Sequence, residues 1–215
     1  LGMLLEKQGV NVIYTRKKDV FIGLFERANI ANQSDAQLFI SIHCDAFRTS
    51  QPYGAGTFVL GLHANERNFE IAKKENSVIF YEDDYENTYD GFDPNNPESV
   101  IGLTLMQEEY LDQSIIAASY IQNSFVNSLQ RKNRDVKQAG FAVLRYTYMP
   151  SVLVETGFLT NKNEGLYLNS NKGQTEIANA ISLAVLKYRN DFFKNLSTSS
   201  ISNESSNNNL FYRVQ

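Results

Sequence analysis

The chain has 215 residues, a formal net charge of −4 and a sequence pI near 5.3. With 42% hydrophobic and 20% charged residues, its composition is that of an ordinary globular protein, and its length suffices for one sizeable α/β domain. The acidic balance argues against a nucleic-acid-binding face. No apolar run approaches the roughly 20 residues that a membrane-spanning helix needs, and a single cysteine excludes an internal disulfide framework.

The chain opens on residues typical of the last turns of a helix, Leu1 to Gln8, closed by Gly9. Domains rarely begin within a helix. We therefore expect the natural protein to start earlier, so the absence of a targeting segment from these residues is uninformative.

Apolar runs and helical periodicities alternate along most of the remaining chain. Strands are predicted over 10–15, 38–46, 57–60, 140–146 and 150–158, and helices over 20–33, from about 64 to 79, over 99–129 with a break near 112–114, over 162–168 and over 170–188. Asn161 is the expected N-cap of the helix at 162–168, with Glu164 completing a capping box. This alternation predicts an α/β fold with a single twisted, mostly parallel sheet and helices on both faces.

We place this domain at residues 1–190. Two segments differ from the rest of the chain in composition. Residues 82–98 are acidic, aromatic and rich in turn formers, so they are predicted to form a surface insertion that extends, with the start of the next helix, over 82–113. Residues 191–209 are rich in Ser and Asn and predict a flexible linker. The six strand-like residues at 210–215 suggest the start of a second, truncated domain.

The strand over 38–46 ends in His43-Cys44-Asp45. Ligands of open α/β sheets bind beyond the carboxyl ends of the strands, so these side chains lie at the usual place for a site. Strand alternation lets His43 and Asp45 share one face while Cys44 points away. A functional imidazole and a hydrogen-bonded core histidine both remain open at this point.

A second buried-strand run, over 150–158, carries Glu155. A carboxylate at the mouth of an apolar strand is costly to ionise unless a cation or hydrogen-bond donors lie near it. A metal near His43 would supply the cation; a helix cap or an ion pair with an arginine is the alternative. Complementary residue types at two strand ends favour one shared cleft.

Several separated motifs, taken together, resemble the zinc-dependent N-acetylmuramoyl-L-alanine amidases, the type 3 catalytic domain of bacterial cell-wall hydrolases. The resemblance covers roughly residues 1–190. Its motifs are Tyr14-Thr15-Arg16 with Asp19, Leu24 and Arg27 to Asn29; Asp35 to His43; Gln138 to Leu144; and Pro150 to Asn161 with Glu164.

The resemblance implies hydrolysis of the amide between N-acetylmuramic acid and L-alanine in peptidoglycan, outside the cytoplasm, in the periplasm or cell envelope. The family's zinc is held by two His and one Glu, which leaves a position for water. His43 corresponds to one ligand and Glu155 to the catalytic glutamate. The other two ligands are expected upstream of Leu1, together with the first strand of the sheet and the signal peptide. The 215-residue chain is therefore expected to bind zinc weakly or not at all.

Further expectations follow from the resemblance. Residues 210–215 resemble the first strand of a peptidoglycan-binding module, so they are the possible start of a truncated wall-binding domain. Asp45 is a candidate to orient His43, and His63 is a minor candidate for the metal. In some relatives an inserted helix blocks the zinc cleft until an activator protein moves it. Here the 82–113 insertion occupies that place, with Glu108 or Glu109 as the blocking ligand; a substrate-contacting flap or a helix packed on the sheet are the alternatives.

Two other functions remain open for the chain. One is a non-catalytic peptidoglycan-binding or regulatory relative that lacks the full zinc site. The other is a zinc peptidase that acts on stem peptides.

Overall fold

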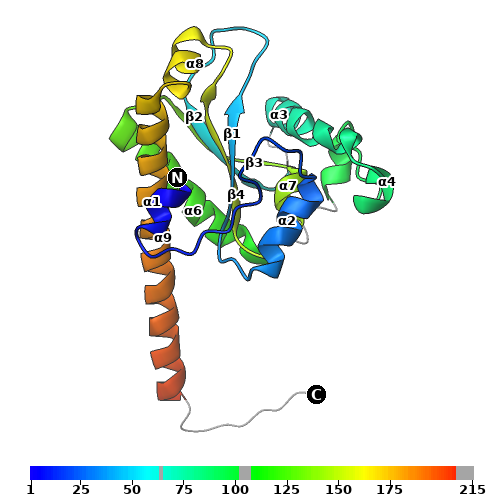
Figure 1. Ribbon diagram of the computed structural model, residues 1–215. Coiled ribbons are helices and arrows are strands. Elements are labelled where there is room, and N and C mark those ends of the chain that lie inside the picture. The colour runs from blue at the N-terminus through cyan, green and yellow to red at the C-terminus, as the bar shows by residue number, and fades with distance from the viewer. Residues whose placement is uncertain (63–64, 102–107, 207–215) are drawn as a thin grey trace.

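The computed structural model describes residues 1–62, 65–101 and 108–206. A four-stranded sheet lies at the centre, in the order β1-β4-β2-β3 (Figure 1). Its strands are β1 (Phe39–Asp45), β2 (Ala55–Leu60), β3 (Asn133–Ala139) and β4 (Ser151–Phe158). The β1–β4 and β2–β3 pairs are parallel and the β2–β4 pair is antiparallel, so the predicted α/β fold with a mostly parallel sheet is confirmed.

Helices cover both faces of this sheet (Figure 1). They are α1 (Gly2–Glu6), α2 (Leu24–Gln33), α3 (Glu66–Asn76), α4 (Tyr85–Thr88), α6 (Glu108–Leu129), α7 (Ala142–Arg145), α8 (Lys162–Leu168) and α9 (Asn171–Ser206), with 3₁₀ turns at Ser77–Tyr81 and Pro97–Val100. Helices α6 and α9 pack on one face, and α2, α3 and α7 lie over the other. None of the described helices is long and apolar enough to cross a bilayer.

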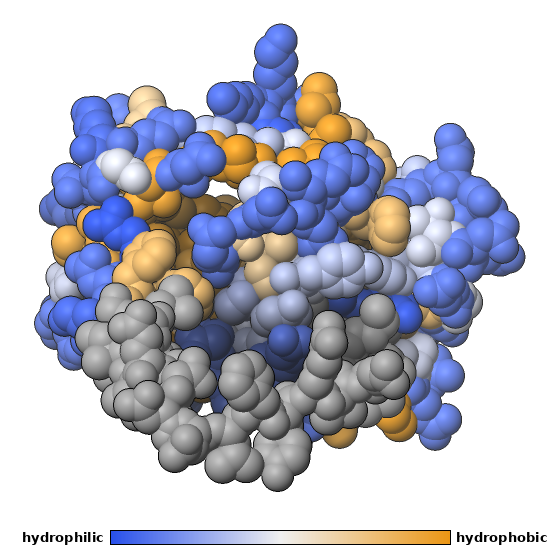
Figure 2. Space-filling view, turned by 90° about the horizontal axis from the view of Figure 1, so that it is seen from below, coloured by the Kyte–Doolittle hydropathy of each residue, from blue (hydrophilic) through white to orange (hydrophobic). Residues whose placement is uncertain are grey.

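Alternation along the strands divides the apolar side chains between two cores. In β4, Leu153 belongs to the core under α2, α3 and α7, while Val152 and Val154 belong to the core under α6 and α9. All eight residues of β4 are buried, because this strand has neighbours on both edges and helices on both faces. Seen from below, the molecule presents mostly hydrophilic residues, with smaller hydrophobic patches between them (Figure 2).

The predicted strand over 10–15 is wrong, because these residues form an irregular segment. Val10 and Val12 pack partly buried against the α6–α9 core. The alternation of apolar and polar residues therefore reflects burial on one side of the segment, although the segment does not join the sheet. The next predicted element, the helix over 20–33, is confirmed except for its first four residues, because α2 begins at Leu24.

The predicted strand over 140–146 is also wrong. Residues Ala142–Arg145 form the short buried helix α7, and the sheet strand is the preceding segment, β3. Because β3 has a polar sequence, its pattern of apolar residues does not predict a strand. As an edge strand it is only half-buried, so it tolerates charged side chains that an interior strand would not.

Helix α6 runs without a break through 112–114. Ser114 is buried, but its hydroxyl donates to the carbonyl of Tyr110 and accepts from the Ser151 amide. A polar residue with both partners inside the fold need not end a helix. Residues 102–107, where the predicted helix also extended, lie outside the described residues.

Most of the segment at 82–98 lies at the surface, as its composition predicts, but two of its aromatic side chains are part of the core. The side chains of Tyr89 and Phe92 are 0% and 6% exposed and belong to the core under α2 and α3. The Glu82 carboxylate accepts a 2.8 Å hydrogen bond from the Leu24 amide at the start of α2 and another from the Tyr89 hydroxyl. The segment is therefore anchored in the domain.

Helix α9 continues to Ser206, through most of the range predicted as a flexible linker. Extending an existing helix costs much less than starting one, so polar residues can follow an apolar helix in the same conformation. Residues 210–215 lie outside the described residues.

Candidate active site

His43 and Glu155 are register partners in the parallel β1–β4 pair. The pairing shifts immediately beyond them, between His43 and Asp45, where β1 approaches its end. Both residues therefore sit at the carboxyl ends of neighbouring strands, where α/β proteins place their sites. The predicted juxtaposition of these two side chains is present.

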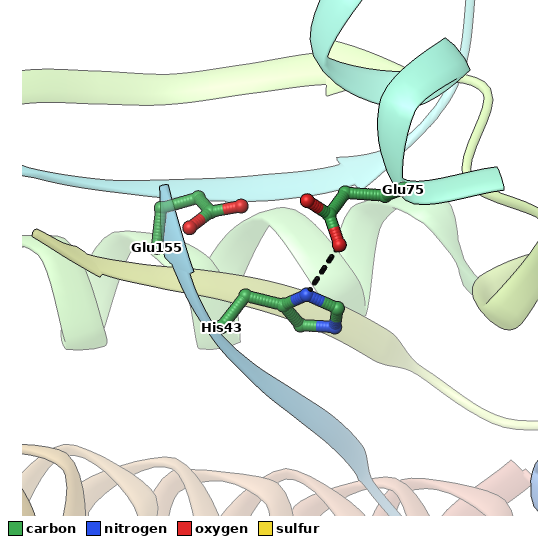
Figure 3. A group of neighbouring side chains, drawn as sticks. All are labelled: His43, Glu75 and Glu155. Atoms are coloured by element: carbon green, nitrogen blue, oxygen red, sulfur yellow. Dashed lines mark hydrogen bonds and ion pairs between the residues drawn. The ribbon is translucent and has the colours of Figure 1, made fainter. Parts of the chain in front are cut away.

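Both ring nitrogens of His43 have partners. The Ser41 hydroxyl lies 2.8 Å from Nε2, and a carboxylate oxygen of Glu75 lies 2.8 Å from Nδ1 (Figure 3). The side chain of His43 is 19% exposed, so one part of the ring still faces the outside. Glu75, and not Asp45, is the residue that orients this imidazole.

Glu75 comes from the last turn of α3, directly before the buried residue Asn76. The Asn76 side chain donates to the carbonyl of Gly140 and accepts from the Ala142 amide, which fixes this end of α3 against the sheet. Burial opposes ionisation of Glu75, but the hydrogen bond and charge of His43 outweigh it and hold the pKa of Glu75 below its usual value. Glu75 is therefore an ionised partner of His43.

Glu155 differs sharply from Glu75. Its side chain is 3% exposed, and neither carboxylate oxygen has a hydrogen-bond partner among the described residues. Burial, followed by the negative charges of Asp45 and Glu75, raises the pKa of Glu155 to about 9. A buried carboxyl group of this kind is uncharged at neutral pH unless a cation joins it.

The three side chains can share one cation. One donor atom from each of His43, Glu75 and Glu155 lies within 4.8 Å of the others, and the two carboxylates point toward each other beside the imidazole (Figure 3). One imidazole and two carboxylates are a donor set that Zn²⁺ accepts. The unpartnered oxygens of Glu155 supply the second argument, because a cation would satisfy them.

The structure separates the other candidates from this cluster. Asp45 is buried and its pKa is raised by burial, but no hydrogen bond joins it to His43. Cys44 is exposed and contacts the Thr156 hydroxyl at 3.2 Å. Glu108 and Glu109 are exposed and are not part of the cluster, and His63 lies outside the described residues.

Sequence reasoning missed Glu75. A weak signal for it exists, because Ala72 and Asn76 mark the buried face of α3 and Glu75 lies at the edge of that stripe. A carboxylate at the edge of a buried face needs a partner, but the sequence does not reveal which strand end the helix crosses.

Comparisons with known proteins agree with this geometry. A family profile described as N-acetylmuramoyl-L-alanine amidase matches residues 1–187. The chain belongs to this family. The amidase family is zinc-dependent, which agrees with the donor set formed by His43, Glu75 and Glu155.

Relatives within the amidase family cover most of the chain. It is 31% identical over 191 residues to the N-acetylmuramoyl-L-alanine amidase AmiA of Escherichia coli K12, covering 86% of this chain and 63% of AmiA. It is 32% identical over 202 residues to AmiC of E. coli O6:H1, covering 87% of this chain and 44% of AmiC. The chain therefore spans less than two thirds of the length of these relatives.

Solved structures of amidases share the fold. An N-acetylmuramoyl-L-alanine amidase from Clostridium difficile 630 superposes with a TM-score of 0.62 at 23% identity, covering 88% of this chain and 79% of that one. The CwlD amidase from Clostridioides difficile, solved in complex with the GerS lipoprotein, gives a TM-score of 0.59 at 23% identity, covering 87% and 80%.

Proposed function

We propose that this chain is the catalytic part of a zinc-dependent N-acetylmuramoyl-L-alanine amidase that hydrolyses the amide between N-acetylmuramic acid and L-alanine in peptidoglycan. The observation that supports this most is the pairing of His43 with a buried, unpartnered Glu155 in one metal-competent cluster. Because peptidoglycan lies outside the cytoplasm, we place the protein in the periplasm or cell envelope.

Each residue has a distinct role in this proposal. His43 would hold the zinc ion together with the ligands implied upstream of Leu1, and Glu75 would add a carboxylate at the position that water needs. In the structure, the hydrogen bonds to Ser41 and Glu75 fix the plane of the imidazole. Zinc, when bound, supplies a Lewis acid that polarises the scissile carbonyl and lowers the pKa of water. Glu155 accepts the proton of the attacking water and passes it to the departing amine nitrogen of L-alanine.

The environment of Glu155 suits a residue that carries a proton in both directions. Burial raises its pKa to about 9 in the metal-free protein, whereas a neighbouring cation lowers the pKa of a carboxyl group. Balanced between these influences, the carboxylate can take a proton near neutral pH and give it up again.

The resemblance also implies a further His and Glu ligand upstream of Leu1. We retain them as part of the proposal for the longer protein. Within the chain Glu75 adds a carboxylate that this ligand count did not include, so weak or absent zinc binding is no longer what we expect of the 215 residues.

Regulation is the second part of the proposal. Because Glu75 reaches the metal cluster from α3, an activator protein that moves α3, by acting on this helix or on the 82–113 segment, would open the site. The 2.8 Å Glu75–His43 contact, and not Glu108 or Glu109, is the bond that such a partner must break. In the longer protein, Glu75→Gln should then raise basal hydrolysis; an unchanged rate would exclude a blocking role.

The test of the activity is product analysis. Muropeptides carrying the intact lactyl–alanine amide are incubated with the longer gene product, and the products are identified by mass spectrometry. Release of free peptide beginning with L-alanine supports the amidase. Cleavage within the peptide would establish a peptidase, and absence of cleavage by a zinc-loaded protein would favour a binding or regulatory role.

A further inference from the structure

Three cationic side chains gather on the same side of the sheet as Glu155. Arg134 and Lys137 belong to β3, and Arg67 belongs to the first turn of α3. Each lies over an aromatic ring: Arg67 is 5.6 Å from the ring centroid of Phe47, Arg134 is 4.9 Å from that of Phe158, and Lys137 is 5.4 Å from that of Phe58. We call Arg67, Arg134 and Lys137 the cationic wall.

The register of the sheet places Arg134 on the same face as Glu155, with one strand between them. Glu155 pairs with His43 on one side and with Gly56 on the other. A Cβ atom added to Gly56 would lie 3.4 Å from Cβ of Arg134 in the next strand. At this level of the sheet, β2 therefore contributes no side chain between Glu155 and Arg134.

The three cations are close enough to repel one another. Burial, followed by the positive charges of Arg134 and Arg67, lowers the pKa of Lys137 to about 8. Asp135 and Asp45 offset this only partly. Within the described part of the chain, no carboxylate forms an ion pair with any of the three residues.

Arg131 shows what a structural arginine looks like in the same protein. Its guanidinium lies 2.7 Å from the Glu164 carboxylate and donates a 3.0 Å hydrogen bond to the carbonyl of Thr156. Arg67 and Lys137 have no comparable acceptor within the described residues, and Arg134 has only the carbonyl of Tyr53, at 3.2 Å. Asp45 is the carboxylate whose charge acts on all three cations, so the cationic wall keeps an excess of positive charge. Such an excess is arranged for a ligand that brings further negative charge.

We propose that the cationic wall binds a free carboxylate of the stem peptide, one residue beyond the scissile amide. The inference rests on the proposed amidase function and adds the specificity determinant of the same site. In peptidoglycan the residue after L-alanine is a γ-linked glutamate, and its α-carboxyl is free unless it is amidated. Arginine forks match a carboxylate in geometry as well as in charge.

The distances agree with this assignment. Arg134 lies two strand spacings from Glu155, which is about 10 Å. An extended peptide advances about 3.5 Å per residue, so a carboxylate on the residue after L-alanine reaches about 7 to 10 Å from the scissile bond. The wall is therefore at the right separation for this carboxylate and too far away to contact the scissile carbonyl.

The test compares two ligands that differ in one group. The 215-residue chain is titrated with L-alanyl-γ-D-glutamate and with the matching α-carboxamide by isothermal calorimetry. We expect the acid to bind about tenfold more tightly than the amide, as one charge-assisted hydrogen-bonded pair would give. Arg67→Gln and Lys137→Gln should each remove most of this preference.

Lys187→Gln is the matched control, because Lys187 also lies over an aromatic ring, that of Tyr120 at 4.4 Å, on the opposite side of the sheet. This substitution should leave the preference intact. Arg67 and Lys137 donate no hydrogen bond to the described chain, so their glutamine variants should fold, which thermal unfolding verifies. Equal binding of acid and amide, or a preference that survives both substitutions, overturns the inference.

Hydrolysis of the two corresponding muramoyl dipeptides separates this inference from the proposed function. Cleavage of both at equal rates by the longer protein, with equal affinity of the chain for both peptides, would refute the cationic wall and leave the amidase standing. Selective binding of the acid without cleavage of either substrate would uphold the wall and refute the amidase.

Discussion

His43 and Glu155, 112 positions apart in the sequence, are direct register partners in the β1–β4 pair. Side chains at paired positions of a parallel ladder project from the same face, so strand pairing alone brings the imidazole and the carboxylate together. Helix α3 then adds Glu75 from above the same face. The rigid sheet thus fixes two donors of the cluster, while the third depends on how one helix packs.

The first prediction concerns the proton carried by Glu155. Glu155→Gln keeps the size of the side chain but cannot accept a proton, so hydrolysis of the muramoyl–alanine amide by the longer protein should fall by about 10² to 10⁴-fold. The exposed Glu70→Gln is the matched control on α3 and should retain full activity. A Glu155→Gln protein with more than a tenth of the original rate would remove this residue from the chemistry.

The second prediction concerns pH and stability in the metal-free chain. The pKa of Glu155 is raised from 4.5 to about 9 in the folded protein, so between these values the folded state holds a proton that the unfolded state has lost. Stability then falls as pH rises, by up to about 1.4 kcal/mol per pH unit from this one group. The Glu155→Gln variant has no carboxyl group at this position, so it lacks this loss of stability at high pH.

Urea unfolding in the presence of a chelator measures this effect. The two proteins should be similarly stable near about pH 5, and the variant should be more stable by a few kcal/mol near about pH 8. Zinc should narrow the difference, because a cation stabilises the ionised form of Glu155. A difference that does not change with pH would mean that Glu155 is ionised throughout.

Much of the fold could be predicted from sequence because β1 and β4 are apolar runs bounded by polar residues. The strand ends carrying His43 and Glu155 follow from the same pattern. The edge strand β3 could not be found this way, since its exposed side leaves it polar. The strand predicted over 10–15 is wrong for the opposite reason, because burial on one side of an irregular segment produces the same alternation as a strand.

Glu75 and the cationic wall could not be predicted from the sequence. Both depend on where α3 lies over the sheet, and that position is set by contacts between distant residues such as Asn68 and the carbonyl of Gln138, at 3.1 Å. Likewise, the burial of Tyr89 is a tertiary effect, because its acidic neighbours give the segment the composition of a surface loop.

The third prediction concerns zinc. If Glu75 is a ligand, Glu75→Gln should lower the zinc affinity of the 215-residue chain by about tenfold or more, since an amide is a poorer ligand than a carboxylate. Competition with a chromogenic chelator measures this, with Glu70→Gln as the control. Equal affinities for the variant and the original chain would confine Glu75 to orienting His43.

The fourth prediction concerns the segment at 82–113. Because Tyr89 and Phe92 are buried in the core, deleting the segment should unfold or strongly destabilise the domain and not simply unblock it. A milder variant, Glu82→Ala, removes the acceptor of the Leu24 amide and of the Tyr89 hydroxyl and should cost about 1 to 3 kcal/mol in urea unfolding. Asp83→Ala, at an exposed position, should cost little. A stable deletion protein with raised hydrolysis would restore the view of a detachable insertion.

The fifth prediction concerns Glu164, in the first turn of α8. Its side chain binds backbone amides near the start of β2 and the end of β4. Its carboxylate accepts the amides of Gly54 at 3.1 Å and Phe158 at 2.8 Å while it pairs with Arg131. The prediction of Asn161 as the N-cap is confirmed, but the Glu164 side chain serves this buried network and not a capping box.

Glu164→Gln removes the charge that compensates a nearly buried guanidinium, so we expect a loss of about 3 to 5 kcal/mol in the free energy of unfolding. Glu176→Gln is the control, because the amide oxygen can still accept the hydrogen bond from the Tyr167 hydroxyl. Only the ion pair with the exposed Lys172, at 3.8 Å, is lost, so this variant should lose only about 0.5 kcal/mol. Because Gly54 and Phe158 lead into β2 and out of β4, the Glu164 variant should also weaken the binding of zinc. Equal losses for the two variants would show that Arg131 finds another partner or water when Glu164 is neutral.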